Sequence, residues 1–163
     1  MPEYIILGID PGLRYTGCGI IRQTGKNIEY LDSGFIETKA NMKFPDRLLK
    51  IYKEIEKVIE KFKPDSMAIE QSIYAQNVNI ALKLGHARGM AILAAARNNL
   101  EIGEYPPKQI KSSVTGNGSA SKEQVKFMVA NLLKITPNML SFDSSDALAT
   151  AICHFNNFKL TGL

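Results

Sequence analysis

Cysteine is scarce in this chain, with only two such residues among 163. Cys18 and Cys153 lie far apart, and neither belongs to a CxxC motif or to a Cys/His cluster. The sequence therefore suggests neither a disulfide framework nor a zinc site. We expect both cysteines to be small, buried hydrophobic side chains.

Long hydrophobic runs are missing as well. The longest strongly apolar segment, residues 89–96, is far too short to span a bilayer, and the N-terminus has no basic-then-apolar signal pattern. The sequence also shows no internal repeat, linker or break in composition. These absences predict a folded, cytoplasmic protein with no membrane partner.

The composition that remains is that of an ordinary globular protein. Apolar residues make up 45% of the chain and charged residues 22%, values that exclude disorder for the bulk of it. The length predicts a single domain, over residues 1–157, followed by a short C-terminal tail at 158–163. Twenty Lys and Arg outnumber sixteen Asp and Glu, for a net charge of +4, and this mild excess favours a polyanionic partner such as nucleic acid.

The period of the apolar residues predicts an α/β fold. Three strands come first and form an antiparallel meander, and two later strands, separated by helices, lie parallel in the same sheet. The expected fold class is thus a mixed five-stranded sheet flanked by helices. The predicted strands are residues 4–10, 15–22, 27–37, 66–70 and 100–105; the predicted helices are 45–62, 77–98, 121–136 and one from about 143; a flexible loop is expected at 114–119 and a frayed end at 156–163.

Asp10 ends the first predicted strand, where the buried core meets solvent. An unpaired carboxylate is costly to bury, so it must be exposed at the strand end or compensated by a cation. Asp10-Pro11-Gly12 also fits a simple tight turn. Asp10 alone does not decide between a turn and a metal ligand.

Three further acids favour the metal site. Glu70 ends the strand that a right-handed crossover places parallel to the first, so Asp10 and Glu70 meet at one edge of the sheet. Asp143 and Asp146 stand three residues apart at the start of the last helix, where they either cap that helix or face the same edge. Four converging carboxylates require cations. Their all-oxygen donors select Mg²⁺ or Mn²⁺, and two such ions suit phosphodiester hydrolysis.

Several motifs together identify a family. The sequence resembles the RuvC family of Holliday-junction resolvases (crossover junction endodeoxyribonucleases), within the RNase H-like superfamily, over nearly the whole chain. The motifs are Ile9-Asp10-Pro11-Gly12, Thr16-Gly17-Cys18-Gly19, Ile69-Glu70-Gln71, residues 81–89 (ALKLGHARG), residues 116–122 (GNGSASK) and residues 143–149 (DSSDALA).

The resemblance implies an RNase H-like nuclease domain with Asp10, Glu70, Asp143 and Asp146 as a catalytic, metal-binding tetrad. It also implies two Mg²⁺ ions per site, with Mn²⁺ able to substitute, and a homodimer that nicks two strands of a four-way junction symmetrically. A branch-migration motor is the expected protein partner. Lys111 and Lys122, with Lys108 nearby, are expected to contact DNA phosphates. Where the family often has an aromatic residue three positions after the second-strand acid, this chain has Ile73. Tyr74 follows, either as the candidate wedge at the junction centre or as a loop tyrosine half packed on the domain.

Other interpretations stay open at this point. Residues 8–12 also resemble the phosphate-binding hairpin of actin- or Hsp70-like modules, although one domain is too short for such a fold. A catalytically silent junction-binding module of the same fold is a third hypothesis. Ala81, Gly85 and Gly89 form a small-residue ridge on one helix, which packs either on the last helix or on a second copy of the chain.

Overall fold

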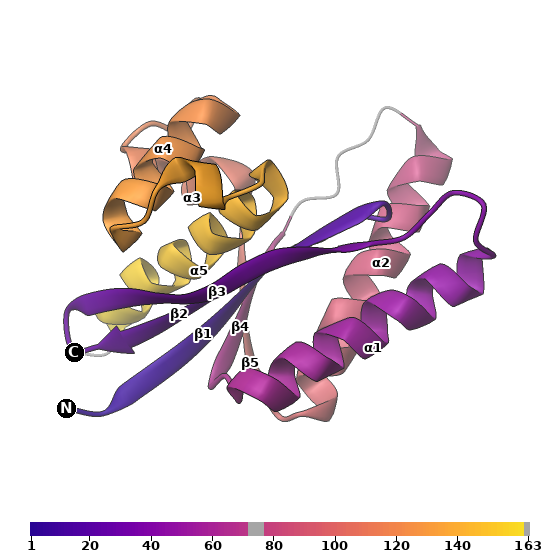
Figure 1. Ribbon diagram of the computed structural model, residues 1–163, viewed down its shortest axis with the longest axis horizontal. Helices are drawn as coiled ribbons and strands as arrows, with labels where there is room; N and C mark the ends of the chain where they lie inside the picture. The colour runs from indigo at the N-terminus through magenta and orange to yellow at the C-terminus, as the bar shows by residue number, and fades with distance from the viewer. Residues whose placement is uncertain (72–76, 162–163) are drawn as a thin grey trace.

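A mixed five-stranded sheet with helices on both faces forms the protein (Figure 1). The computed structural model describes residues 1–71 and 77–161. The strand order is β3-β2-β1-β4-β5. The strands are β1 (Glu3–Asp10), β2 (Tyr15–Thr24), β3 (Asn27–Glu37), β4 (Ser66–Glu70) and β5 (Glu101–Tyr105). The helices are α1 (Phe44–Phe62), α2 (Val78–Arg97), α3 (Pro107–Thr115), α4 (Lys122–Leu133) and α5 (Phe142–Thr161), with a 3₁₀ turn at Pro137–Met139.

The three-strand meander is confirmed. β1 pairs antiparallel with β2, and β2 with β3, which is an edge strand. The turn between β2 and β3 contains Gly25 at a φ of 60°, the left-handed conformation that short hairpin turns require and glycine readily adopts. The register sets Asp10 opposite Gly17 and Gly17 opposite Phe35, in one row across three strands.

The parallel half of the sheet is confirmed too. β4 lies parallel to β1 with Ile9 beside Ile69, and β5 lies parallel to β4. Each parallel step is made through a helix, α1 before β4 and α2 before β5. Because Asp10 and Glu70 each follow one member of the Ile9–Ile69 pair, the two acids end adjacent strands at the same edge.

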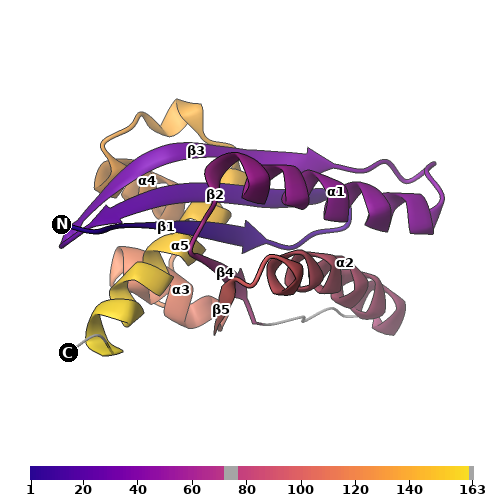
Figure 2. The ribbon, with the colours of Figure 1, turned by 90° about the horizontal axis from the view of Figure 1, so that it is seen from below.

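The sheet separates two hydrophobic cores. On one face, Leu7, Ile9 and Met67 pack with the buried stripe of α1 and with the alanines of α2. On the other, Ile6 and Ile21 pack with α3, α4 and α5. Figures 1 and 2 show the same division, with α1 and α2 on one side and the other three helices opposite. α5 and α2 are therefore on opposite faces, which excludes the alternative in which the last helix covers the small-residue ridge of α2.

Glycines let α5 lie directly on the strands. A Cβ added at Gly8 would stand 2.0 Å from the carbonyl oxygen of Ala147, and one at Gly17 would stand 2.1 Å from that of Asp143. At Gly19 it would meet the Leu148 side chain at 2.6 Å. Real Cβ atoms do not approach other atoms so closely, so these positions must remain without side chains for α5 to sit where it does.

Two expectations about the C-terminal half are wrong. Val114 and Thr115 were expected in a flexible loop, but they end α3, and Val114 is buried. α3 begins at Pro107, and proline is well suited to the first helical position, where its missing N–H costs nothing. The frayed end expected from Asn156 is also incorrect, since α5 continues to Thr161. Asn156 is held by α3, because its Nδ2 donates to Ser113 Oγ at 2.7 Å.

The helix predicted from residue 121 is confirmed, and a capping box begins it. Ser121 Oγ accepts from the Gln124 N–H at 3.1 Å, and Gln124 Oε1 accepts from the Ser121 N–H at 2.9 Å. This capping box sets where Lys122, the first residue of α4, projects. Within the described residues, no helix is long and apolar enough to cross a membrane.

Gly8→Ala tests the close packing of α5. The added methyl has to displace the α5 backbone, so the variant should lose about 1–3 kcal/mol of unfolding free energy. Thermal and urea unfolding measure the loss. Gly34→Ala is the matched control, since a Cβ there meets nothing within 4 Å and Gly34 also lies in the sheet. Equal stability of the two variants would contradict this account of the packing.

Candidate active site

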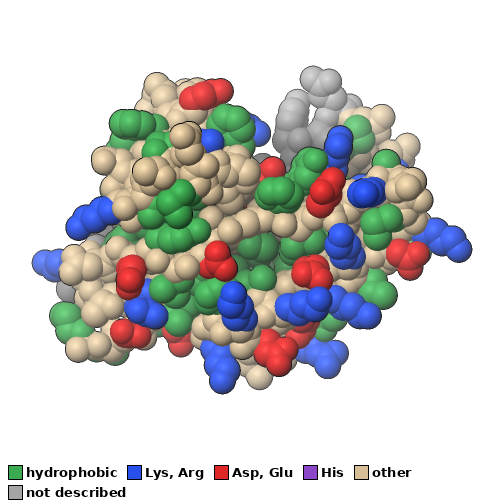
Figure 3. Space-filling view, in the orientation of Figure 1, with side chains coloured by type: hydrophobic (Ala, Val, Ile, Leu, Met, Phe, Trp, Pro, Cys, Tyr) green, Lys and Arg blue, Asp and Glu red, His purple; other side chains and the backbone are tan. Residues whose placement is uncertain are grey.

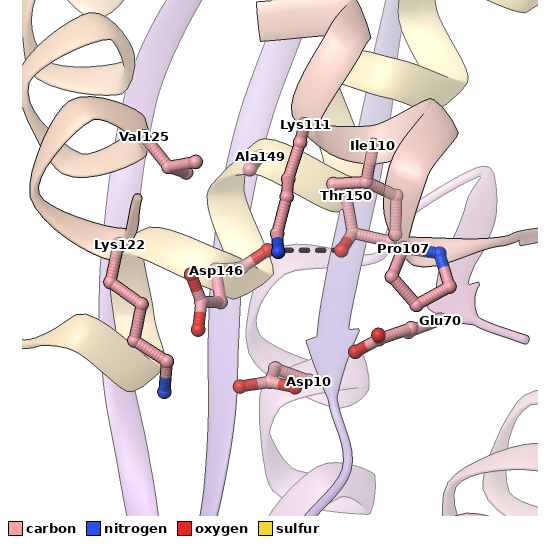
Figure 4. Close-up of a pocket in the computed structure, with 10 residues that line it drawn as sticks. All are labelled: Asp10, Glu70, Pro107, Ile110, Lys111, Lys122, Val125, Asp146, Ala149 and Thr150. Carbon is pink, nitrogen blue, oxygen red and sulfur yellow. Dashed lines mark hydrogen bonds between the residues drawn. The ribbon is translucent and has the colours of Figure 1, made fainter. Parts of the chain in front are cut away.

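Three carboxylates from separate elements point into one cavity. Asp10 comes from the end of β1, Glu70 from the end of β4 and Asp146 from the second turn of α5 (Figure 4). The cavity measures about 270 Å³. Its lining residues are Asp10, Glu70, Pro107, Ile110, Lys111, Lys122, Val125, Asp146, Ala149 and Thr150.

Asp143 lies beside this cavity without lining it. It stands in the first turn of α5, and its carbonyl oxygen is the atom packed against Gly17. Its carboxylate is near enough to contribute to the raised pKa values of Asp10 and Asp146. The structure thus brings three of the four predicted acids into one cavity and the fourth to its margin.

The acids at the start of α5 are not needed to cap it. Ser141, just before the helix, accepts from the Ser144 N–H through its Oγ at 3.1 Å. Ser144 Oγ in turn accepts from the Ser141 N–H at 3.0 Å. This reciprocal pair satisfies the N–H of Ser144 in the first turn and that of Ser141 before it, as a capping box does. Helix capping therefore does not account for Asp143 and Asp146.

The protein environment disfavours the ionised carboxylates. Burial, and after it the negative charges of Asp146 and Glu70, raise the pKa of Asp10 to about 8. Burial is also the main cause that raises the pKa of Glu70 and of Asp146. Like charges gathered in a buried place have this effect, and a bound cation would reverse it.

Two lysines face the acids across the cavity. Lys111 projects from α3 and Lys122 from the start of α4 (Figure 4). Both act to lower the pKa values of Glu70 and Asp146. Lys108 is exposed and does not line the cavity. Ile73 and Tyr74, the candidate wedge residues, lie outside the described residues.

Glu70 is anchored through its main chain by a residue that sequence reasoning missed. Arg88 on α2 donates from Nε to the Glu70 carbonyl oxygen at 3.1 Å, and its Nη2 lies 2.9 Å from Glu104 Oε1 on β5. The N–H of Gln71 donates to the Tyr105 carbonyl at 2.8 Å. Arg88 had one signal in the sequence, a lone charge among small residues in the middle of a helix.

The apolar part of the cavity wall was missed for another reason. Pro107 and Ile110 belong to α3, which was not predicted, and Val125 and Ala149 are helix residues whose direction depends on how α4 and α5 pack. Thr150 Oγ1 donates to the Asp146 carbonyl oxygen at 2.9 Å, the dashed line in Figure 4. No sequence pattern distinguishes these residues from ordinary core positions.

The two histidines lie away from the acids. His154 is buried, with Nε2 3.1 Å from Ser66 Oγ and Nδ1 2.7 Å from the Tyr105 hydroxyl. His86 is exposed on α2 and contacts the ring of Phe44 edge-on. Neither lines the cavity.

The donor chemistry fits a hard divalent cation. Asp10, Glu70 and Asp146 offer carboxylate oxygens and no nitrogen or sulfur, the set that Mg²⁺ and Mn²⁺ prefer. Within the part of the chain that the structure describes, no three His, Cys, Asp or Glu side chains are already gathered as a metal-binding group. The carboxylates therefore suit a divalent cation by their ligand type and charge, and they must turn toward one another to share an ion.

The fold and the position of the acids define a class. A sheet of order β3-β2-β1-β4-β5, with acids at the ends of β1 and β4 and a further acid on a helix across them, is an RNase H-like nuclease fold. A yeast mitochondrial Holliday junction resolvase, Ydc2, shares this fold with a TM-score of 0.63 at 16% identity, over 97% of this chain and 84% of that one.

The comparisons then identify the family. The model of the family "Crossover junction endodeoxyribonuclease RuvC" matches residues 6–154. The RuvC protein of Ruminiclostridium cellulolyticum is 46% identical over 98% of this chain and 96% of its own, and that of Photorhabdus laumondii is 52% identical over 93% and 88%. A structure of Thermus thermophilus RuvC in complex with Holliday junction substrate has a TM-score of 0.90 at 26% identity, covering 97% and 96% of the two chains. The chain belongs to the RuvC family, and the resemblance found in the sequence is confirmed.

The raised pKa of Asp10 predicts how the stability of the metal-free protein depends on pH. The folded state holds this proton more tightly than the unfolded chain, so the stabilisation is complete below about pH 4 and is lost as pH rises through about 8. Between about pH 5 and about pH 8 the free energy of unfolding should fall by at least about 1 kcal/mol. Urea unfolding in a chelating buffer measures it.

Asp10→Asn should flatten this dependence, because the amide does not titrate. Asp46→Asn, an exposed acid at the start of α1, is the matched control and should keep the wild-type slope. A saturating concentration of Mg²⁺ should also reduce the slope in the wild type, since the cation favours the ionised carboxylate. The same pH dependence in Asp10→Asn and in the wild type would contradict the assignment to Asp10.

Proposed function

We propose that this protein is a metal-dependent endonuclease that resolves four-way DNA junctions by paired, symmetric nicks. The observation that carries the proposal is the convergence of Asp10, Glu70 and Asp146 on one cavity that Lys111 and Lys122 also line. Membership of the RuvC family supports the junction as substrate.

The acids have complementary roles in this proposal. Asp10 and Glu70, at the ends of adjacent strands, would hold divalent cations between them, and Asp146, with Asp143 at the margin, would complete the ligand set and orient the attacking water. We propose two Mg²⁺ ions, replaceable by Mn²⁺. Such a pair of ions supplies an activated water and a Lewis acid for the leaving oxygen of an in-line displacement at phosphorus.

The lysines of the cavity suit the scissile phosphate. Lys111 on α3 and Lys122 on α4 project into the cavity and would hold phosphate oxygens while water attacks (Figure 4). Lys108 would then contact the DNA backbone further out, because it is exposed and outside the cavity. The face seen in Figure 3 is different, since basic and acidic side chains alternate there without forming a continuous basic track.

We also propose a homodimer, because two symmetric nicks require two active sites. The surface of α2 supports this. Val78, Leu82 and Leu93 are 75%, 56% and 50% exposed, and they lie with Gly89 on one stripe of the helix. A Cβ at Gly89 would meet nothing within 4 Å. An apolar stripe with a gap at glycine suits the approach of the same helix from a second copy across a two-fold axis.

Three further points complete the proposal. We propose that residues 1–157 form a single nuclease domain, although α5 extends past that boundary to Thr161, so the tail at 158–163 begins within a helix. A branch-migration motor is proposed as the partner by family membership alone. A cytoplasmic location follows from the proposed DNA substrate.

Membership of the RuvC family removes the actin- or Hsp70-like alternative. The nicking assay below tests the other alternative, a catalytically silent junction-binding module.

Asp10→Asn and Asp146→Asn should abolish nicking while junction binding is retained. Loss of one carboxylate from the proposed metal site should lower the rate by at least about 100-fold, because the charge that stabilises the transition state is misplaced. Labelled four-way junction, linear duplex and RNA–DNA hybrid are compared with and without Mg²⁺, and Asp46→Asn serves as the control. Full activity of either variant, or a preference for linear duplex, would refute the proposal.

Leu82→Glu should convert the proposed dimer into a monomer, because a carboxylate in the middle of the stripe has no partner when buried. Size-exclusion chromatography with light scattering gives the mass. Phe127→Glu, on α4 across the sheet, is the control, since Phe127 is 62% exposed and should leave the mass unchanged. A wild-type protein that is monomeric at all accessible concentrations would overturn the dimer.

A further inference from the structure

Phe35 occupies an unusual position relative to the acids. It lies on the edge strand β3 and is 49% exposed. A single exposed apolar side chain is ordinary on a protein surface and means nothing by itself. What distinguishes Phe35 is its register, because it stands opposite Gly17, which stands opposite Asp10.

The register also sets the face on which Phe35 lies. Paired residues of neighbouring strands point to the same side of a sheet, and Gly17 faces α5, since a Cβ there would meet Asp143. Phe35 therefore projects on the side of the active-site cavity. Two strand spacings separate it from Asp10, a distance of about 10 Å.

Two neighbours complete a patch around Phe35. The ring of Tyr15 meets that of Phe35 edge-on, with 5.4 Å between centroids. The guanidinium of Arg14 lies over the Tyr15 ring, 5.2 Å from its centroid, and Arg14 is exposed. We call Arg14, Tyr15 and Phe35 the Phe35 patch. It combines an open aromatic face with a cation, the combination on which proteins stack bases beside a phosphate backbone.

We propose that the Phe35 patch binds the DNA strand that is to be cut, with one unstacked base of that strand lying on the ring of Phe35 and Arg14 contacting its backbone. A stacked strand rises about 3.4 Å per nucleotide and an unstacked one advances further, so 10 Å corresponds to at most about three steps from the phosphate at the acids. The proposal rests on the proposed function, since it assigns a further contact to the same substrate.

The geometry favours DNA over a protein as the occupant. The patch is continuous, through Gly17, with the edge of the sheet where the acids and the two cavity lysines stand. A second aromatic–cation pair lies at the same end of α5, where Lys126 Nζ is 5.1 Å from the Phe142 ring centroid and Phe142 is 41% exposed. Glu37 is the one acid of β3 that lies on the same face of the sheet as Phe35, and it is only partly exposed.

The first experiment measures binding without cleavage, in the Asp10→Asn protein, by fluorescence anisotropy of a labelled junction. Phe35→Ala should weaken binding at least about fivefold, the low end for loss of one stacked base. Phe35→Leu, which keeps the apolar bulk but has no aromatic face, should weaken it similarly, whereas Phe35→Tyr should stay within about twofold. Leu49→Ala, on α1 and 48% exposed, is the matched control and should have no effect.

The second experiment locates the base. An abasic site is placed in turn at each of the roughly four nucleotides nearest the cut. At one of these positions the abasic site should weaken binding by the Asp10→Asn protein that retains Phe35. The same abasic site should not weaken binding by the Phe35→Ala variant any further, because the base and the ring contribute through the same contact.

The outcomes separate this inference from the proposed function. If the wild type nicks junctions and Phe35→Ala binds them as well as its parent does, the patch is not a DNA contact and the endonuclease proposal stands. The patch is likewise not a DNA contact if every abasic site weakens binding equally in the protein with Phe35 and in the Phe35→Ala variant. A wild-type protein that neither binds nor nicks a junction overturns both.

Discussion

The contact between the α5 backbone and the glycines of β1 and β2 is the constraint on which the rest of the site depends. Helices usually rest on a sheet through side chains, which keep the two backbones apart. Here the carbonyl oxygens of Ala147 and Asp143 occupy the space where Gly8 and Gly17 would carry a Cβ. The approach brings Asp146 to the cavity that Asp10 borders, so a helix and a strand supply acids to one site.

That closeness creates an electrostatic cost which the rest of the cavity reduces only in part. Burial and mutual repulsion raise the pKa values of Asp10, Glu70 and Asp146, while Lys111 and Lys122 act in the opposite direction. A site that holds its carboxylates at such a cost in the free protein is one that gains most from binding a divalent cation. The scissile phosphate brings further negative charge, so the lysines on the far wall suit the substrate as well as the acids.

The two faces of the sheet have separate functions, and Arg88 links them. One face carries the cavity and, along the same row of the sheet, Phe35. The other carries α1 and α2, with the exposed apolar stripe of α2 that the dimer proposal uses. Arg88 extends from α2 to the carbonyl of Glu70, so the helix proposed to meet a second copy also supports the strand end that carries a candidate ligand.

Local chemistry in the sequence determined much of this protein. The apolar periods predicted all five strands, the handedness of the crossover placed Asp10 beside Glu70, and Ser121 with Gln124 marked the start of α4, because each of these depends on near neighbours or on a rule of chain geometry. The family was readable from the motifs around the acids. Only the tertiary structure decided that Asp143 stays at the margin, that Pro107 begins a helix whose Ile110 and Lys111 line the cavity, and that Phe35 shares a row with Asp10. These depend on how helices and strands distant in sequence come to rest against one another, which no local pattern records.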